Sequence, residues 1–188
     1  MSFNRKGFVL CKSQGAPYTQ TTFKVVATAN NAYYINDPVK LEGGTGLAER
    51  VTASSSTLLG IVKAPYKNSN GQKRPLTHSL PTNGAYLTSG QAGFVEVVTD
   101  PRARFIAALD TSASAGLIGK YIGVTAGAPN QASGLSGYGL KAATVTAVNN
   151  RPFQIVEISD FEKAIYGRNT DIAGDAGVVV KLANALIS

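Results

Sequence analysis

The chain contains one cysteine, Cys11, and one histidine, His78, so the side chains that most often perform covalent or metal chemistry are nearly absent. One thiol and one imidazole cannot form a zinc cage by themselves, and a single cysteine excludes an intrachain disulfide. A Cys11–His78 nucleophilic pair is conceivable. Nothing in the sequence orients the two side chains, so a free thiol and a surface histidine are the better interpretation. We therefore expect no metal site.

Other patterns that could carry catalysis are incomplete. The glycines of 43–46 lack the Lys-Ser/Thr pair that a phosphate loop requires, and 134–139 does not follow the dinucleotide pattern. The acidic turn at 171–175 lacks the full ligand set of a calcium loop. The carboxylates that could form the acid–base pair of a glycoside hydrolase are Asp100, Asp110, Glu157, Asp160 and Glu162. A sugar site usually also offers aromatic platforms, and tryptophan is absent, so we expect neither an enzyme nor a cofactor.

Basic side chains gather in two segments of the chain, whose formal net charge is +7. Every charged residue before Asp37 is basic, and a second basic run follows residue 62. Such segments suit an acidic protein surface or nucleic acid, and the alternative is ordinary solvated charge. The candidate partner contacts are Arg5, Lys6, Lys12, Lys24, Lys63, Lys67, Lys73 and Arg74.

The overall composition indicates a folded chain with unusually little charge. Hydrophobic residues make up 44% and charged residues 15% of the 188 positions. Isolated soluble domains carry about a quarter charged residues, so part of the uncharged surface is expected to be an interface. No apolar run approaches the roughly 20 residues of a membrane span, and 8–11 is too short for a signal-peptide core. We expect a protein of a reducing cytoplasm that makes no membrane contact.

The elements that must position these residues are mostly strands. Runs of β-branched and aromatic residues, separated by turn signals, indicate an all-β chain with few helices. The expected strands are 23–29, 32–35, 39–41, 47–52, 58–64, 93–99, 104–109, 120–125, 140–148, 152–158 and 178–183. Residues 111–117 could hold a short helix, and the polar segment 66–81, broken at Asn70-Gly71, predicts a protruding loop or hairpin tip. Asn149-Asn150 predicts a hairpin between the strands on either side of it.

Many short strands favour a single β-barrel or β-sandwich domain, predicted for 23–188, with long loops and an extended basic N-terminal arm over 1–22. Such a barrel would also suit a single-stranded nucleic-acid binder, which needs basic residues interleaved with aromatics on one face. The candidate aromatics are Phe23, Tyr33, Tyr34 and Tyr66. They are scattered, and the clearest strands carry more acid than base, so nucleic acid is an alternative rather than the expected partner.

Several motifs in the second half of the chain share one pattern. The motifs are 93–101 (GFVEVVTDP), 104–109 with the small-residue stretch 111–122, the Gly-Leu-Ser-Gly core of 132–137, 152–158 (PFQIVEI) and, earlier, 59–62 (LGIV). Together they resemble the capsid-decoration or cement proteins of tailed bacteriophages. The resemblance covers somewhat under half of the chain.

This resemblance implies a β-barrel or tulip-like protein on the outer face of an icosahedral head, often as a homotrimer at three-fold positions. Its partners would be copies of itself and the major capsid protein, whose subunits it would clamp against internal DNA pressure. It would be located in the virion, which is assembled in the host bacterial cytoplasm. A tail or neck component of the same virion and the single-stranded nucleic-acid binder stay open as alternatives.

The basic arm and the long 66–81 loop depart from the family pattern. The scarcity of charge fits interfaces that are repeated many times, since buried charges need partners. We hypothesise that residues 1–24 reach a neighbouring subunit and order on its acidic surface. Deleting them would then leave the barrel folded but weaken capsid binding.

Overall fold

The computed structural model describes residues 7–11, 19–25, 32–53, 55–70, 72–75, 87, 92–158 and 177–184. In these residues the chain forms two antiparallel sheets, and the only helical element is a short 3₁₀ turn, η1 (Ala115–Leu117). The predicted all-β, sandwich-like fold is therefore confirmed. Over the same residues no helix is long and apolar enough to cross a membrane.

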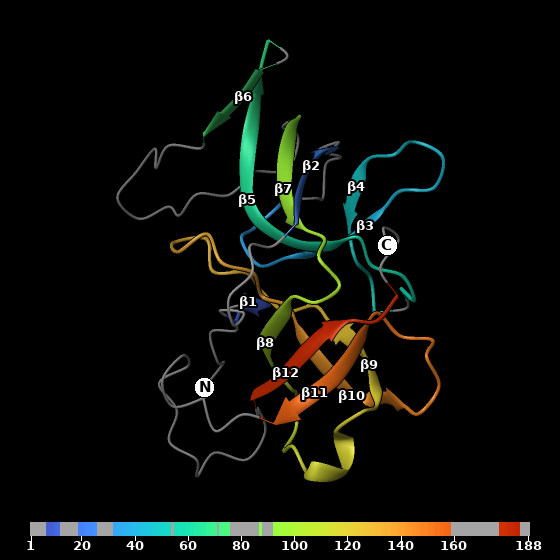
Figure 1. Cartoon of the computed structure of the whole chain (residues 1–188). Coiled ribbons are helices and arrows are strands. Elements are labelled where there is room, and N and C mark those ends of the chain that lie inside the picture. The colour runs from blue at the N-terminus through green and yellow to red at the C-terminus, as the bar shows by residue number, and fades with distance from the viewer. Residues whose placement is uncertain are drawn as a thin grey trace.

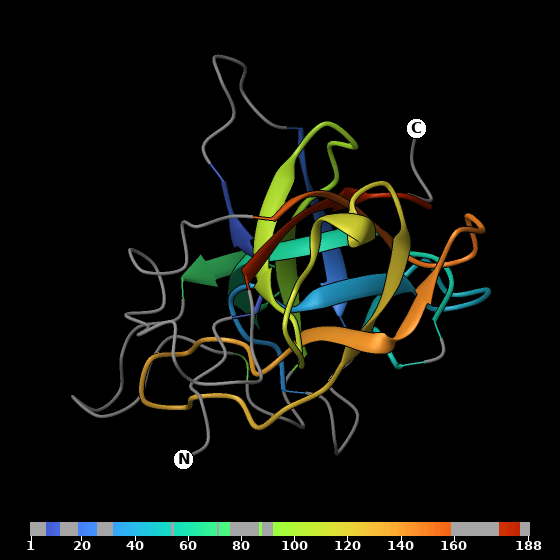
Figure 2. The ribbon, with the colours of Figure 1, turned by 90° about the horizontal axis from the view of Figure 1, so that it is seen from below.

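The first sheet lies in the lower half of Figure 1 and has the strand order β1-β8-β12-β11-β9-β10. Its strands are β1 (Val9–Leu10), β8 (Arg104–Ala108), β12 (Gly177–Leu182), β11 (Phe153–Ile158), β9 (Tyr121–Thr125) and β10 (Gly139–Thr146). The sheet curls, because Leu140 on β10 returns to bridge Leu109 just after β8. The Asp110 amide donates to the Leu140 carbonyl across this contact at 3.1 Å. Viewed from below in Figure 2, the strands curve around one another and do not lie flat.

The second sheet lies above the first and has the order β2-β7-β5-β3-β4, with β6 paired to β5 alone. Its strands are β2 (Gln20–Val25), β7 (Gly93–Val98), β5 (Gly60–Ser69), β3 (Pro38–Leu41), β4 (Ala48–Arg50) and β6 (Gln72–Pro75). The sheet is also curved, since the edge strands β2 and β4 come into contact. β5 is the longest strand and runs from the middle of the molecule to its upper tip (Figure 1).

Each curled sheet encloses a hydrophobic core, and alternating side chains explain which residues fill it. On β7, buried Val95 and Val97 alternate with half-buried Phe94 and Glu96. The core of the second sheet gathers Val25, Tyr33, Val39, Ala48, Leu59, Val62, Leu87, Val95 and Val97. Four residues of the upper half instead join the core of the first sheet: Val51, Leu58, Ile61 and Val98. The two sheets therefore share apolar packing where they meet.

The N-terminal segment departs from the predicted arm. Phe8 is fully buried in the first core, where its ring stacks on Phe153 with centroids 4.4 Å apart. Val9 and Leu10 pair with Ile106 and Phe105 of β8. β2 likewise begins at Gln20, inside the span assigned to the arm. Residues 1–6 and 12–18 lie outside the described part of the chain.

The hypothesis that residues 1–24 can be deleted without loss of the fold is thereby corrected. This span contributes a core aromatic, an edge strand of the first sheet and most of β2. The apolar run 8–11 is visible in the sequence, but the two residues that pair with β8 produce no periodic signal that would predict a strand.

The hairpin predicted at Asn149-Asn150 is also wrong. β10 and β11, which flank this turn, do not pair with each other, because β9 lies between them. Tyr121 of β9 has Thr146 on one side and Gln154 on the other as register partners. The turn signal was correct locally, but the sequence does not show that β9 occupies the space between the two strands.

Other predicted elements are present in the structure, with bounds that differ by a few residues. Residues 104–109 form strand β8, the short helix near 111–117 is η1, and 66–81 begins with the β5–β6 hairpin. The expected strand 32–35 is reduced to isolated bridges at Tyr33 and Ile35.

Replacing Phe8 by alanine tests the corrected role of the N-terminus. We expect Phe8→Ala to lower the free energy of unfolding by about 3–5 kcal/mol, because it removes a fully buried ring. Val148→Ala, at a position that is 63% exposed, is the control and should change it by less than about 0.5 kcal/mol. Chemical denaturation followed by circular dichroism measures both. Equal stability of the two variants would contradict the assignment of Phe8 to the core.

Candidate partner-binding site

The structure brings some of the predicted basic contacts together and leaves others undefined. Arg5, Lys6 and Lys12 lie outside the described residues, as does His78. Lys63 and Lys67 are exposed on β5. Lys24 lies on β2, and Lys73 and Arg74 lie on β6. Four of the eight candidates thus fall on a single hairpin.

This hairpin extends beyond the body of the second sheet. β5 and β6 pair from Tyr66↔Pro75 to Ser69↔Gln72, whereas the pairing of β5 with β7 ends at Lys67↔Gly93. The two residues between Ser69 and Gln72 are Asn70-Gly71, and Asn70 has a φ of 51°. Asn-Gly favours such a two-residue turn, because both positions accept a positive φ. The paired segment 66–75, here called the basic ribbon, protrudes at the top of Figure 1.

Basic residues occupy opposite register positions on the basic ribbon. Lys67 and Arg74 are direct cross-strand partners, and the next pair toward the turn is Asn68 and Lys73. Like charges in this position destabilise a strand pair. The chain also has no acidic residue between Glu49 and Glu96, so nothing along this stretch of sequence balances them. The ribbon therefore presents cations that suit an acidic partner.

A row of register partners crosses the second sheet beside the ribbon. Phe94 is the register partner of Lys24 on one side and of Tyr66 on the other, and Tyr66 is in turn opposite Pro75. Phe94 and Tyr66 are half-buried, and neither belongs to the packed groups of the two cores. We call this row of Lys24, Phe94, Tyr66 and Pro75 the outer platform.

A hydrogen bond fixes the middle of the outer platform. The Tyr66 hydroxyl donates to Glu96 Oε2 at 2.8 Å. Burial, and after it the bond to the Glu96 carboxylate, raises the pKa of Tyr66. The phenol therefore remains protonated at neutral pH and keeps its hydrogen to donate. Nearby, Lys63 Nζ donates to Gln20 Oε1 at 3.0 Å and links β5 to the edge strand β2.

Sequence reasoning named Tyr66 as a candidate aromatic but missed Phe94. The two adjacent valines of 93–99 blur the alternation, so the sequence alone does not place Phe94 on either face of the strand. Strict alternation from buried Val95 would have put Phe94 and Glu96 together on the outer face.

A second polar group, fully buried, holds the two sheets together. Asp37, immediately before β3, has no exposed surface. Its Oδ2 accepts the Tyr34 amide at 3.0 Å and lies 3.3 Å from Arg50 Nε at the end of β4. Burial raises the pKa of Asp37 to about 6, while the Arg50 charge and hydrogen bonds from Ser136 and Tyr34 act in the opposite direction. The sequence showed Asp37 only as part of a turn signal.

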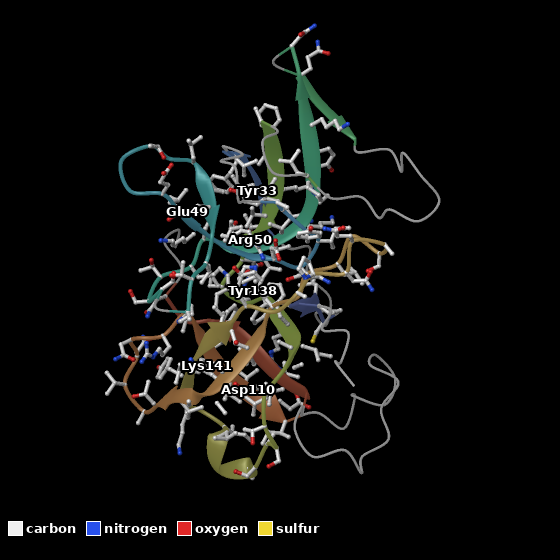
Figure 3. The ribbon with its side chains drawn as sticks, turned by 180° about the vertical axis from the view of Figure 1, so that it is seen from behind. Tyr33, Glu49, Arg50, Asp110, Tyr138 and Lys141 are labelled. Atoms are coloured by element: carbon white, nitrogen blue, oxygen red, sulfur yellow. The ribbon has the colours of Figure 1, made fainter. Side chains whose placement is uncertain are left out.

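Arg50 and Asp37 are tied to the first sheet through the loop before β10. The Arg50 guanidinium lies 4.9 Å from the ring centre of Tyr138, whose hydroxyl donates to the Val51 carbonyl at 2.7 Å. Figure 3 shows Arg50 and Tyr138 next to each other in the middle of the molecule. Gly7 also packs here with a φ of 69°, and a Cβ atom would come within 2.6 Å of the Asn36 carbonyl oxygen. We call this region the waist.

The described residues offer little covalent or metal chemistry. Burial, aided by Glu157, raises the pKa of the Cys11 thiol to about 11, so the nucleophilic thiolate is scarce at neutral pH. Three or more potential metal ligands do not come together anywhere in the described part of the chain. The described residues do present the opposed basic positions of the ribbon and the aromatic pair of the outer platform.

Replacing Asp37 by asparagine tests the waist. The pKa of Asp37 in the folded protein, about 6, exceeds the reference value of 3.8. The contribution of Asp37 to stability is therefore complete below pH 3.8 and is lost as the pH rises through 6. The advantage of the wild type over Asp37→Asn in free energy of unfolding should therefore shrink by roughly 2 kcal/mol between pH 4 and pH 7. Denaturant titrations of both proteins across this range measure the difference, in which other carboxylates cancel. A constant difference would contradict the raised pKa.

Comparison with known proteins identifies no relative of this chain. No protein-family model, no curated protein and no solved structure matches the chain at a significant level. The function is therefore argued from the ribbon, the outer platform and the waist themselves.

Proposed function

We propose that this chain is a virion structural protein, a capsid decoration or cement protein that binds the outer face of an icosahedral head. There it stabilises contacts between major capsid subunits, as a homo-oligomer. The observation that carries the proposal is the basic ribbon, in which Lys67 faces Arg74 at a position where folding alone favours opposite charges. An acidic partner surface offsets this repulsion, so the bound ribbon gains the favourable charge interactions that the free hairpin lacks.

The rest of the molecule is consistent with an adhesive role. A two-stranded hairpin outside a sheet is marginally stable in water, so contact with a partner would stabilise the ribbon. Two cores joined at a buried waist supply a stiff base for it. The small charged fraction of the chain suits a particle in which one interface is repeated many times.

Binding to expanded, DNA-free heads of the phage that encodes this chain tests the proposal. We expect saturable co-sedimentation at a fixed ratio to the major capsid protein, with the mass of the free protein measured by light scattering. The double variant Lys67→Glu/Arg74→Glu should bind at least tenfold more weakly, because it reverses the charge of the ribbon. Lys120→Glu/Lys141→Glu changes the net charge equally, just before β9 and on β10 of the first sheet, where the register partner of Lys141 is the uncharged Gly123, and is the matched control.

A single reversal separates binding from folding. Lys67→Glu places opposite charges across the ribbon, so its melting temperature should equal or exceed that of the wild type while its binding to heads falls. If the double variant and its control bind heads equally, the ribbon is not the contact. If the wild type does not bind heads at all, the decoration function is wrong.

A further inference from the structure

Building on the proposed function, we infer that the outer platform is a second part of the capsid contact. It receives an extended acidic segment of a capsid subunit that carries an apolar side chain. The apolar side chain packs on Phe94 and Tyr66, and the carboxylates of the segment face the lysines around them.

The aromatic pair is the first argument. Phe94 and Tyr66 are direct cross-strand partners on the face of the sheet that points away from its core. Core packing therefore does not explain two adjacent aromatic rings at these positions. Aromatic residues are enriched in the centres of protein interfaces, where they supply large contact areas at little entropic cost.

The geometry of the pair is the second argument. The hydrogen bond from the Tyr66 hydroxyl to Glu96 holds one ring in place, and the ladder holds Phe94 beside it. Lys63 is likewise tied to Gln20. A surface that is already ordered loses less entropy on binding, so these contacts prepare the platform for a partner.

Charge decides the chemistry of the partner. Lys24 is the register partner of Phe94, and Lys63 is exposed on β5, where it donates a hydrogen bond to Gln20 of β2. An acidic segment complements this arrangement. Single-stranded nucleic acid fits it less well, because the rings are half-buried, whereas bases stack on open aromatic faces.

The test uses the full chain and the same phage heads. Phe94→Ser should weaken binding at least tenfold, and Val148→Ser, which removes an exposed apolar side chain outside the platform, should not. Lys63→Glu is a second variant at an exposed position, and it should weaken binding while lowering the melting temperature by only a few degrees, because the bond to Gln20 that it removes is exposed. Soluble polyglutamate should compete with the heads for the wild type.

The outcomes separate this inference from the function on which it rests. If the wild type binds heads and both Phe94→Ser and Lys63→Glu bind equally well, the platform inference is overturned while the decoration function stands. If a single-stranded oligonucleotide displaces heads and polyglutamate does not, the partner is nucleic acid and the inference also fails. If the wild type binds no heads, the failure belongs to the proposed function.

Discussion

Asp37 is completely buried, and a buried carboxylate must be offset by a cation and by hydrogen-bond donors. Arg50 supplies the cation, and the Tyr34 amide is one of the donors. Because Asp37 precedes β3 and Arg50 ends β4, the pair fixes the edge of the second sheet. Tyr138 lies against Arg50 and comes from the loop that leads into β10 of the first sheet, so one interaction sets how the two sheets meet. The shared apolar residues at the waist can then pack in a single arrangement.

The waist also determines what the rest of the second sheet can do. β5 begins there, pairs with β3 and β7, and continues into the ribbon with β6. A strand anchored at one end by two cores can present its other end to a partner without a core of its own. The ribbon and the outer platform are therefore consequences of one long strand whose base is held rigidly.

The strands could be predicted from the sequence because β-branched residues and turn signals act locally. Their arrangement could not, since β9 separates two strands that adjoin in sequence, and the two residues of β1 give no periodic pattern. At the candidate site, the basic segments were visible as composition. The hairpin register is required to see that Lys67 lies opposite Arg74. Assigning Phe94 to the outer face requires knowledge of which face of β7 is buried. Asp37 looked like an ordinary turn residue, because burial of a charge depends on elements far away in the chain.

The ribbon shows how a local conflict can point to function. A hairpin selected for stability alone would place a carboxylate opposite Lys67, and the chain has none between Glu49 and Glu96. At the waist the chain does the reverse and places Arg50 against a buried carboxylate. Lys181 and Arg104 are also register partners, but β12 and β8 each pair on both sides within the first sheet, so neighbouring strands hold them together. On the ribbon β6 pairs with β5 alone, and the opposed cations have no such support. Sequences are expected to be locally consistent with their folds except at functional sites, so this contrast favours the protruding end of β5 as the place where the molecule meets its partner.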